Sequence, residues 1–163
     1  MRVRVLAGIA MGAAILCCVQ AKAADAKEWV TDFKKAAETA KKSGKYMLLD
    51  FTGTDWCVWC VRLKREVFSH KEFKEFAKEN LVCVLLDFPR WKKQPDRIKQ
   101  QNQALMRKYR IRGIPTIIIL SPKGEGVART GYRWGGAAAY VTHLKEIIDA
   151  HKAKVEKEEG KKE

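Results

Sequence analysis

Two cysteines stand two residues apart in the segment Asp55 to Val61, which reads DWCVWCV. A cysteine pair at this spacing can carry out thiol–disulfide exchange, supply half of a zinc site, or form a small structural crosslink. A zinc site needs four ligands, and the sequence offers no second pair, because Cys83 lies within an apolar strand run and His70 on another helix. A disulfide that closes so small a ring would stabilise the chain little. The pattern therefore favours a redox pair, and we expect no metal.

The pair lies where a predicted strand (46–51) and a short loop lead into a helix predicted from Cys57 to about Phe68. The first turn of a helix has unpaired backbone N–H groups and the positive end of the dipole. A thiolate there is stabilised, so the cysteine pKa falls from about 8.5 towards neutrality. We expect Cys57 to be exposed at the helix N-terminus and Cys60 to lie one turn deeper and more covered. This geometry predicts that Cys57 attacks a disulfide and that Cys60 resolves the mixed disulfide.

A second informative stretch is Arg112 to Thr116, which reads RGIPT. A proline immediately before a β-prone run is awkward because it lacks an N–H. A cis Ile114–Pro115 bond in a tight turn would accommodate it, and an ordinary trans loop proline is the alternative. Such a loop would present backbone polar groups of Ile114, with which an extended substrate chain could pair as an added strand. We therefore predict that Ile114 and Pro115 bind substrate.

Several other side chains could contribute to a site. Trp56 and Trp59 flank the cysteines and either form an aromatic platform for an apolar substrate or pack over the helix, and we carry both as substrate-binding candidates. Trp91 lies in a polar loop and could anchor a partner, although one exposed aromatic residue is ordinary. Trp134 is predicted to cover the sheet edge before the last helix. Cys83 is predicted to be a buried structural thiol, with a regulatory thiol as the alternative.

The segments that must position these residues alternate between apolar spacing typical of helices and short apolar runs typical of strands. Apolar residues recur at helical spacing from Trp29 to Ala40, with Gly44 as a stop. Further helices are predicted over 57–68, 69–78, 95–109 and 136–151, and strands over 46–51, 81–87, 116–120 and 127–130. Ser69 and Glu72 have the spacing of a capping box, and the last strand is predicted to pair antiparallel with the one before it. This alternation predicts an α/β fold, a central sheet covered by helices on both faces.

Residues 1–23 are organised like a secretory signal peptide. Arg2 and Arg4 precede an apolar run from Val5 to Val19, and Ala21 to Ala23 has the small-x-small pattern of a cleavage site. The run is shorter than the roughly 20 residues of a membrane span, so we predict cleavage, with an uncleaved membrane anchor as the alternative.

Removal of this leader leaves a single predicted domain over 24–151 and a charged tail over 152–163 that we expect to be disordered. Acylation of Cys17 or Cys18 is disfavoured, because Leu16 is not a small residue. Of the five cysteines, Cys57, Cys60 and Cys83 then remain, in an oxidising compartment. A Cys57–Cys60 pair would leave one thiol over.

The chain is strongly basic, with 33 Lys and Arg against 19 Asp and Glu. Three of the basic residues lie in the leader, so 30 remain and the net charge falls from +14 to +11. The basic residues are scattered along several segments with acids between them, and no nucleic-acid motif is present. We therefore expect no specific nucleic-acid binding, and only weak attraction to anionic surfaces.

Over about residues 28–151 the chain resembles the thioredoxin superfamily. The resemblance rests on Leu48–Phe51, Trp56–Cys60, Tyr109–Thr116, and Gly124 followed by Gly131. More narrowly, Phe51–Gly53, Asp55–Cys57 and Lys64–Phe68 are similar to exported thioredoxin-like proteins, which are related to the periplasmic C-terminal domain of the bacterial disulfide-reductant transporter.

The resemblance implies a three-layer fold with a mixed sheet, a nucleophilic Cys57 and a resolving Cys60 that form a redox-active disulfide. It also implies a cis Pro115 that faces them and a buried Asp50 that helps to move the proton of Cys60. The chain departs from thioredoxin at the dipeptide between the cysteines, which is Val-Trp instead of Gly-Pro, so the redox potential does not carry over. Asp50 stands one residue further from Cys57 than in thioredoxin, and the segment from Phe88 to Gln101 is longer.

We therefore expect an exported thiol–disulfide oxidoreductase that reduces protein disulfides in the periplasm or outside the cell. It would act as a monomer without a bound cofactor, and an upstream electron donor would restore it. Three alternatives stay open at this point. They are a binding module that kept the fold but lost turnover, a disulfide oxidant or isomerase, and a basic surface-binding protein.

Overall fold

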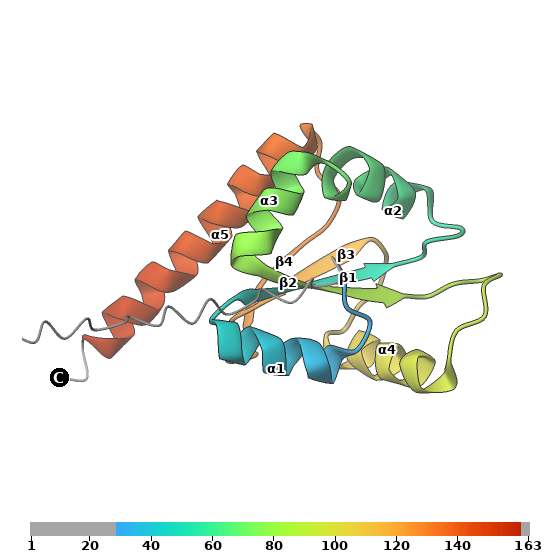
Figure 1. Ribbon diagram of the computed structural model, residues 1–163, viewed down its shortest axis with the longest axis horizontal. Helices are drawn as coiled ribbons and strands as arrows, with labels where there is room; N and C mark the ends of the chain where they lie inside the picture. Colours follow the sequence, from blue (N-terminus) through green and yellow to red (C-terminus); the bar gives the residue numbers. More distant parts are fainter. Residues whose placement is uncertain (1–28, 161–163) are drawn as a thin grey trace, which may run out of the picture.

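The computed structural model describes residues 29–160, which form a four-stranded mixed sheet with the strand order β2-β1-β3-β4 (Figure 1). The central strand β1 (Tyr46–Thr52) runs parallel to β2 (Leu81–Asp87) and antiparallel to β3 (Thr116–Leu120). β3 pairs antiparallel with the edge strand β4 (Gly126–Thr130). The predicted α/β class and the predicted strands are thereby confirmed. The predicted leader over 1–23 lies outside the described residues.

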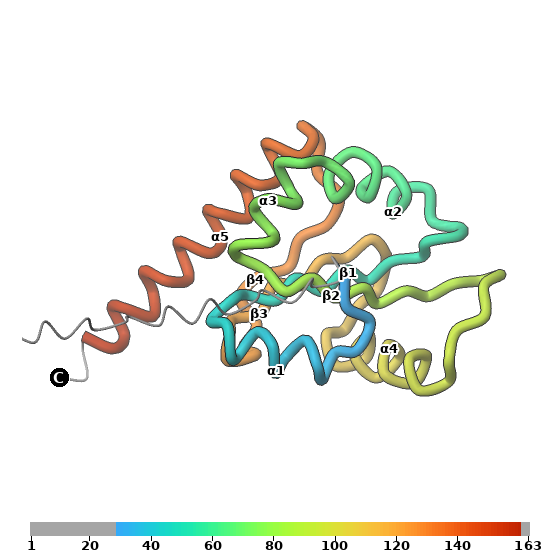
Figure 2. Tube along the Cα trace, in the orientation of Figure 1, coloured from blue at the N-terminus to red at the C-terminus, as the bar shows by residue number. Residues whose placement is uncertain are grey.

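Helices cover both faces of the sheet (Figure 2). α1 (Phe33–Ser43) and α4 (Asp96–Lys108) lie on one face, and α3 (Lys71–Asn80) and α5 (Gly136–Glu159) on the other, with α2 (Val58–Leu63) and a π-helical turn η1 (Lys64–Phe68) above the end of β1. Among the described residues, no helix is both long and apolar enough to cross a membrane.

β1 is buried along its whole length, which explains its nearly continuous apolar sequence. Met47, Leu49 and Phe51 pack in the core under α1 and α4, whereas Tyr46 and Leu48 pack in the core under α3 and α5. Because side chains alternate along a strand, Asp50 points to the same face as Leu48, towards α2 and α5.

The first helix starts later than predicted. α1 begins at Phe33, and the Asp32 side chain caps it by accepting a hydrogen bond from the Lys35 amide. Trp29 is not part of this helix. It packs against Phe68 and Phe73 on the opposite face of the sheet, with ring centroids 5.0 and 6.3 Å apart. The position of Trp29 fits the apolar spacing of the predicted helix, but its side chain packs into the core on the other face of the sheet.

The capping box predicted at Ser69 and Glu72 is wrong. α3 begins at Lys71, with His70 at the N-cap and no side-chain cap hydrogen bond. Ser69 instead ends the π-helical turn, and its amide donates to the Lys64 carbonyl at 2.9 Å. Ser69 is therefore the C-cap of the preceding helical segment and not the N-cap of α3.

The last helix corrects the predicted tail. α5 continues to Glu159, so the disorder predicted for 152–163 is wrong for Lys152 to Glu159. Alanine, lysine and glutamate are strong helix formers, and Lys154 pairs with Glu158 one turn away at 3.8 Å. Val155 is half-buried, so this part of the helix still covers some apolar surface.

Candidate active site

Cys57 and Cys60 form a disulfide at the start of α2. Cys57 is the N-cap residue, in extended conformation, and its Sγ accepts a hydrogen bond from the Cys60 amide at 3.2 Å. The sulfur therefore lies where the first backbone N–H groups and the positive end of the helix dipole converge. This is the position that the sequence predicts for a stabilised thiolate.

Both cysteines are buried, which differs from the predicted contrast between an exposed and a covered one. Cys57 is 6% exposed and Cys60 is 4% exposed. The exposed side chains of α2 are instead Val58 at 76%, and Trp59 and Val61 at 48% each. The loop that carries Ile114 contacts the N-cap sulfur and contributes to this burial.

One covering loop carries the predicted proline. The Ile114–Pro115 peptide bond is cis, which confirms the prediction from the sequence. The Ile114 carbonyl oxygen lies 3.9 Å from Cys57 Sγ. The fold thus places the Ile114 and Pro115 backbone beside the reactive sulfur, as strand addition by a substrate would require. Their role in substrate binding stays a prediction.

The loop between β1 and α2 is fastened to the end of β2. The Asp87 carboxylate accepts hydrogen bonds from the Thr54 amide at 2.9 Å and the Thr54 hydroxyl at 2.7 Å. Gly53 permits the close packing of this loop, because a Cβ atom there would lie 2.7 Å from the Trp56 ring. Sequence reasoning missed the contact between Asp87 and Thr54, because no local pattern links the end of β2 to the loop after β1.

Asp55 fastens the same loop to the segment that follows β2. Its carboxylate accepts hydrogen bonds from three successive backbone amides, those of Arg90, Trp91 and Lys92, at 3.1, 3.0 and 3.1 Å. Burial acts to raise the pKa of Asp55, but the hydrogen bonds from these amides outweigh burial and hold the pKa below its ordinary value. The carboxylate is thus ionised and fully engaged.

Trp56 is a packing residue in this structure. Its Nε1 donates a hydrogen bond to the Phe88 carbonyl at 2.8 Å, and the Arg90 guanidinium lies over its ring at 4.0 Å. Of the two readings of Trp56, packing over the active-site helix accords with these contacts.

Trp59, between the cysteines, belongs to an aromatic cluster with Tyr132 and Trp134. The Trp59 ring lies 5.2 Å from that of Tyr132 and 6.3 Å from that of Trp134. Trp134 does not cover the sheet edge as predicted, since it is 69% exposed beside Trp59. Arg62 lies over the Trp134 ring at 4.4 Å. This cluster continues the exposed apolar surface of α2 away from the disulfide.

Glu66 holds the aromatic cluster to η1. Its carboxylate accepts hydrogen bonds from the Tyr132 hydroxyl and from Arg62 Nε, the latter at 2.6 Å. The Tyr132 and Arg62 hydrogen bonds lower the pKa of Glu66 and outweigh the effect of burial. Sequence reasoning missed Tyr132 and Glu66, because nothing in the local pattern links residues so far apart.

Asp50 is buried beneath the site. It is 5% exposed, and its Oδ1 has no hydrogen-bond partner in the described part of the chain. Burial, with a contribution from the charge of Asp87, raises the pKa of Asp50 to about 8. Burial and the charge of Asp50 also raise the pKa of Tyr140, on α5. Asp50 is therefore mostly protonated at neutral pH, and its role in proton transfer stays a prediction.

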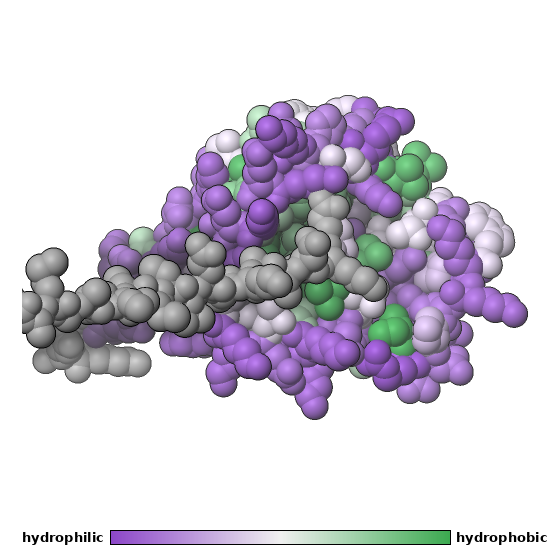
Figure 3. Space-filling view, viewed as in Figure 1, coloured by the Kyte–Doolittle hydropathy of each residue, from purple (hydrophilic) through white to green (hydrophobic). Residues whose placement is uncertain are grey.

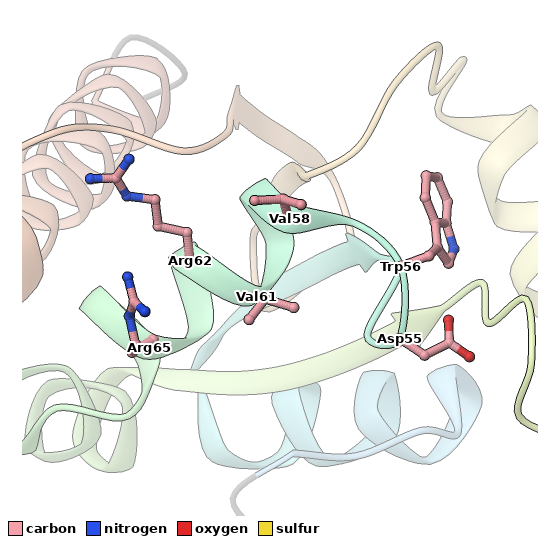
Figure 4. A pocket seen from close by; sticks show the side chains of 6 residues that line it. All are labelled: Asp55, Trp56, Val58, Val61, Arg62 and Arg65. Atoms are coloured by element: carbon pink, nitrogen blue, oxygen red, sulfur yellow. The ribbon is translucent and has the colours of Figure 1, made fainter.

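A shallow depression adjoins the disulfide along the outer face of α2 (Figure 4). Asp55 and Trp56 border it at the loop end, the two valines line its middle, and Arg62 and Arg65 border it further along. Cys83 is buried on β2, which confirms its predicted burial. Within residues 29–160, no three His, Cys, Asp or Glu side chains group as metal ligands would.

Comparison with known proteins gives consistent matches. A family model described as a thioredoxin-like domain matches residues 33–147. The chain is 37% identical over 116 residues to the disulfide bond reductase DsbH of Chlamydia pneumoniae, which covers 71% of this chain and 70% of that protein. It is 31% identical over 107 residues to the thioredoxin-related protein DsbJ of the same organism, but spans only 31% of that protein.

Solved structures agree with these sequence matches. A structure titled DsbH oxidoreductase superimposes with a TM-score of 0.70 at 36% identity, over 72% of this chain and 82% of that one. A thioredoxin from Thermus thermophilus superimposes with a TM-score of 0.56 at 20% identity, over 74% of this chain and 85% of that one, which shows the shared fold.

Proposed function

The chain is a thiol–disulfide oxidoreductase of the thioredoxin-like family, and we propose that it is exported and reduces protein disulfides in the periplasm. The observation that carries the proposal is the Cys57–Cys60 disulfide at the start of α2, with the Ile114 carbonyl 3.9 Å from Cys57 Sγ. The similarity to a disulfide bond reductase over 70% of that protein's length supports the reducing direction.

The reaction begins with the reduced chain. The Cys57 thiolate attacks one sulfur of a substrate disulfide, and the other substrate sulfur leaves as a thiolate and takes up a proton. A mixed disulfide then joins Cys57 to the substrate. Cys60 loses its proton and attacks Cys57 Sγ, which releases the second substrate thiol. Two electrons have passed to the substrate, and the chain holds the Cys57–Cys60 disulfide seen in the structure.

Three parts of the site support these steps. The Cys60 amide and the helix N-terminus stabilise negative charge on Cys57 Sγ. The Ile114 backbone aligns an extended substrate segment beside that sulfur. Burial and Asp87 raise the pKa of Asp50 to about 8, so part of the population is ionised near neutral pH, and this carboxylate form accepts the proton that Cys60 releases.

The proposal also includes export, an electron donor and a monomeric state. The leader over 1–23 has the charge and apolar pattern of a signal peptide, and the functional domain follows it from residue 24. An upstream dithiol donor returns the disulfide to its reduced form, and the chain acts as a monomer without a bound cofactor.

The test is an insulin reduction assay with dithiothreitol and the chain purified without residues 1–23. The chain should accelerate insulin precipitation, and Cys57→Ser should abolish the acceleration. Equal rates for the two proteins would exclude turnover and leave the binding-module alternative. Equilibration against glutathione buffers decides the direction, and we expect a potential more negative than about −180 mV, the value typical of disulfide isomerases.

A further inference from the structure

We propose that the segment Phe88–Lys93, here called the docking loop, binds an acidic segment of the protein whose disulfide reacts with Cys57. The proposal rests on the proposed function and adds the chemical class of its partner. The docking loop lies between β2 and α4, at the end of the sheet where the loop into α2 also lies (Figure 1).

Residues next to Cys57 hold the docking loop in one conformation. Asp55, two residues before Cys57, binds three successive amides of the loop. Trp56, next to Cys57, binds the Phe88 carbonyl through Nε1 at 2.8 Å. The residues that lead into the redox pair therefore also fix the docking loop, so the loop and the disulfide keep a constant relative position.

The fixed loop displays an aromatic side chain. Trp91 is 72% exposed, although its amide is bound to Asp55. The backbone is thus tied down while the indole points to solvent. A lone exposed tryptophan on a mobile loop is ordinary, but tryptophan on a preorganised loop loses little entropy on binding and is enriched at the centre of protein interfaces.

The docking loop also displays positive charge. Arg90, Lys92 and Lys93 are all exposed, and Arg90 is held over the Trp56 ring. Two acids beside the loop are already engaged, because Asp55 accepts three amide hydrogen bonds and Asp87 binds Thr54. Neither needs a further cation, so the cations of the loop remain available to a partner.

The far end of the depression, along α2, also carries cations. Arg62 and Arg65 border it there, and both pair with Glu66, at 2.6 and 3.5 Å, so two cations share one carboxylate. In Figure 3, apolar side chains over α2 lie at the same end of the molecule as the pale and hydrophilic surface over the segment between β2 and α4. A partner that approaches the disulfide thus meets cations on both sides of an apolar strip, which fits an acidic segment with apolar residues.

The experiment uses two synthetic peptides of equal length, each with one internal disulfide and one flanking leucine. One carries glutamates around the disulfide, and the other carries lysines at the same positions. Fluorescence anisotropy with the oxidised chain, purified after expression of the full-length sequence, measures docking without turnover. Stopped-flow reaction with the reduced chain then gives each peptide's rate relative to that of hydroxyethyl disulfide, which is small and neutral.

We expect the glutamate peptide to bind about tenfold or more tightly than the lysine peptide, and added salt to narrow the difference. Lys92→Glu with Lys93→Glu should abolish the preference, and Trp91→Ala should weaken glutamate-peptide binding about five- to tenfold, the effect of an interface anchor. The matched control is Lys41→Glu with Lys42→Glu, which makes the same charge change in the last turn of α1 and should keep the preference.

Equal anisotropy for the two peptides, or loss of the preference in the α1 control as well, would overturn the docking proposal. Failure of the reduced chain to react with hydroxyethyl disulfide would instead overturn the proposed function, and anisotropy would still decide whether the docking loop binds the acidic peptide.

Discussion

The backbone amide of Cys60 donates a hydrogen bond to Sγ of Cys57 across 3.2 Å. The two residues that exchange electrons are therefore also joined by the contact that stabilises negative charge on the attacking sulfur. We expect the same amide to face the Cys57 thiolate after reduction, so that the helix that carries the resolving cysteine also activates the nucleophile.

The first prediction concerns the acidity of that sulfur. In the reduced chain with Cys60→Ser, the rate of alkylation of Cys57 by iodoacetamide should rise with pH around a midpoint below that of free cysteine, about 8.5. Mass spectrometry separates Cys57 from the buried Cys83. A midpoint at or above that of free cysteine would remove the physical basis of the proposed mechanism.

The second prediction separates the two cysteines. The Cys60→Ser variant should accumulate a mixed disulfide with an oxidised substrate peptide, because no thiol is left to resolve it. Cys57→Ser should accumulate none, since Cys60 lies one turn into the helix. Non-reducing gels with mass spectrometry check both, and trapping through Cys60 in the Cys57→Ser variant would reverse the assigned roles.

Asp50 predicts a pH dependence of stability. Its pKa in the folded chain, about 8, lies above the ordinary aspartate pKa of 3.8, so between these pH values the folded state holds a proton that the unfolded state releases. The contribution of Asp50 to the free energy of unfolding is fully present below the pKa of the unfolded state and is lost as the pH rises towards 8. The loss is at most about 1.4 kcal/mol per pH unit. Urea unfolding should show this slope in the wild type and a flatter profile in Asp50→Asn. Equal slopes would show that Asp50 is ionised in the folded chain.

Gly53 predicts a steric effect at the site. Gly53→Ala would place a methyl group 2.7 Å from the Trp56 ring, which is held by Phe88 and Arg90. We expect a loss of about 1–3 kcal/mol in the free energy of unfolding and a change in tryptophan fluorescence. Gly126→Ala is the matched control, because a Cβ there meets nothing within 4 Å. Similar losses in both variants would attribute the effect to glycine replacement itself.

The last turns of α5 predict a separable segment. Deletion of 152–163 should reduce the helical signal in circular dichroism but change the free energy of unfolding by less than about 1 kcal/mol, because only Val155 among these residues is half-buried in the described helix. Insulin reduction should stay at the wild-type rate. A large loss of stability would show that this part of α5 belongs to the folding unit.

The architecture and the reactive pair could be predicted from the sequence because both depend on local signals. The apolar run of β1 and the isoleucines of β3 marked buried strands, and the cis bond before Pro115 followed from its place at the start of β3. Helix ends were less predictable. Ser69 satisfied a capping pattern, but the π-helical turn already used its amide.

The surroundings of the site could not be predicted, because they depend on contacts between distant segments. Asp55 reads as an ordinary loop acid, and only the fold brings three amides of the docking loop to its carboxylate. Likewise, Tyr132 and Glu66 lie on separate elements, and the depth of Cys57 depends on covering loops. Residue type and spacing do not report tertiary burial.

The fastening of the loop before Cys57 has a consequence for substrate choice. Thr54, Asp55 and Trp56 each form a hydrogen bond with a residue on or after β2. The loop before Cys57 therefore has few conformations to adopt when a substrate binds. Most of the conformational entropy that is lost on binding must then be lost by the substrate. Disulfides in flexible or incompletely folded chains can adjust their position to reach Cys57, whereas disulfides inside folded domains cannot. We therefore expect the protein to reduce disulfides of incompletely folded chains in preference to those of folded domains.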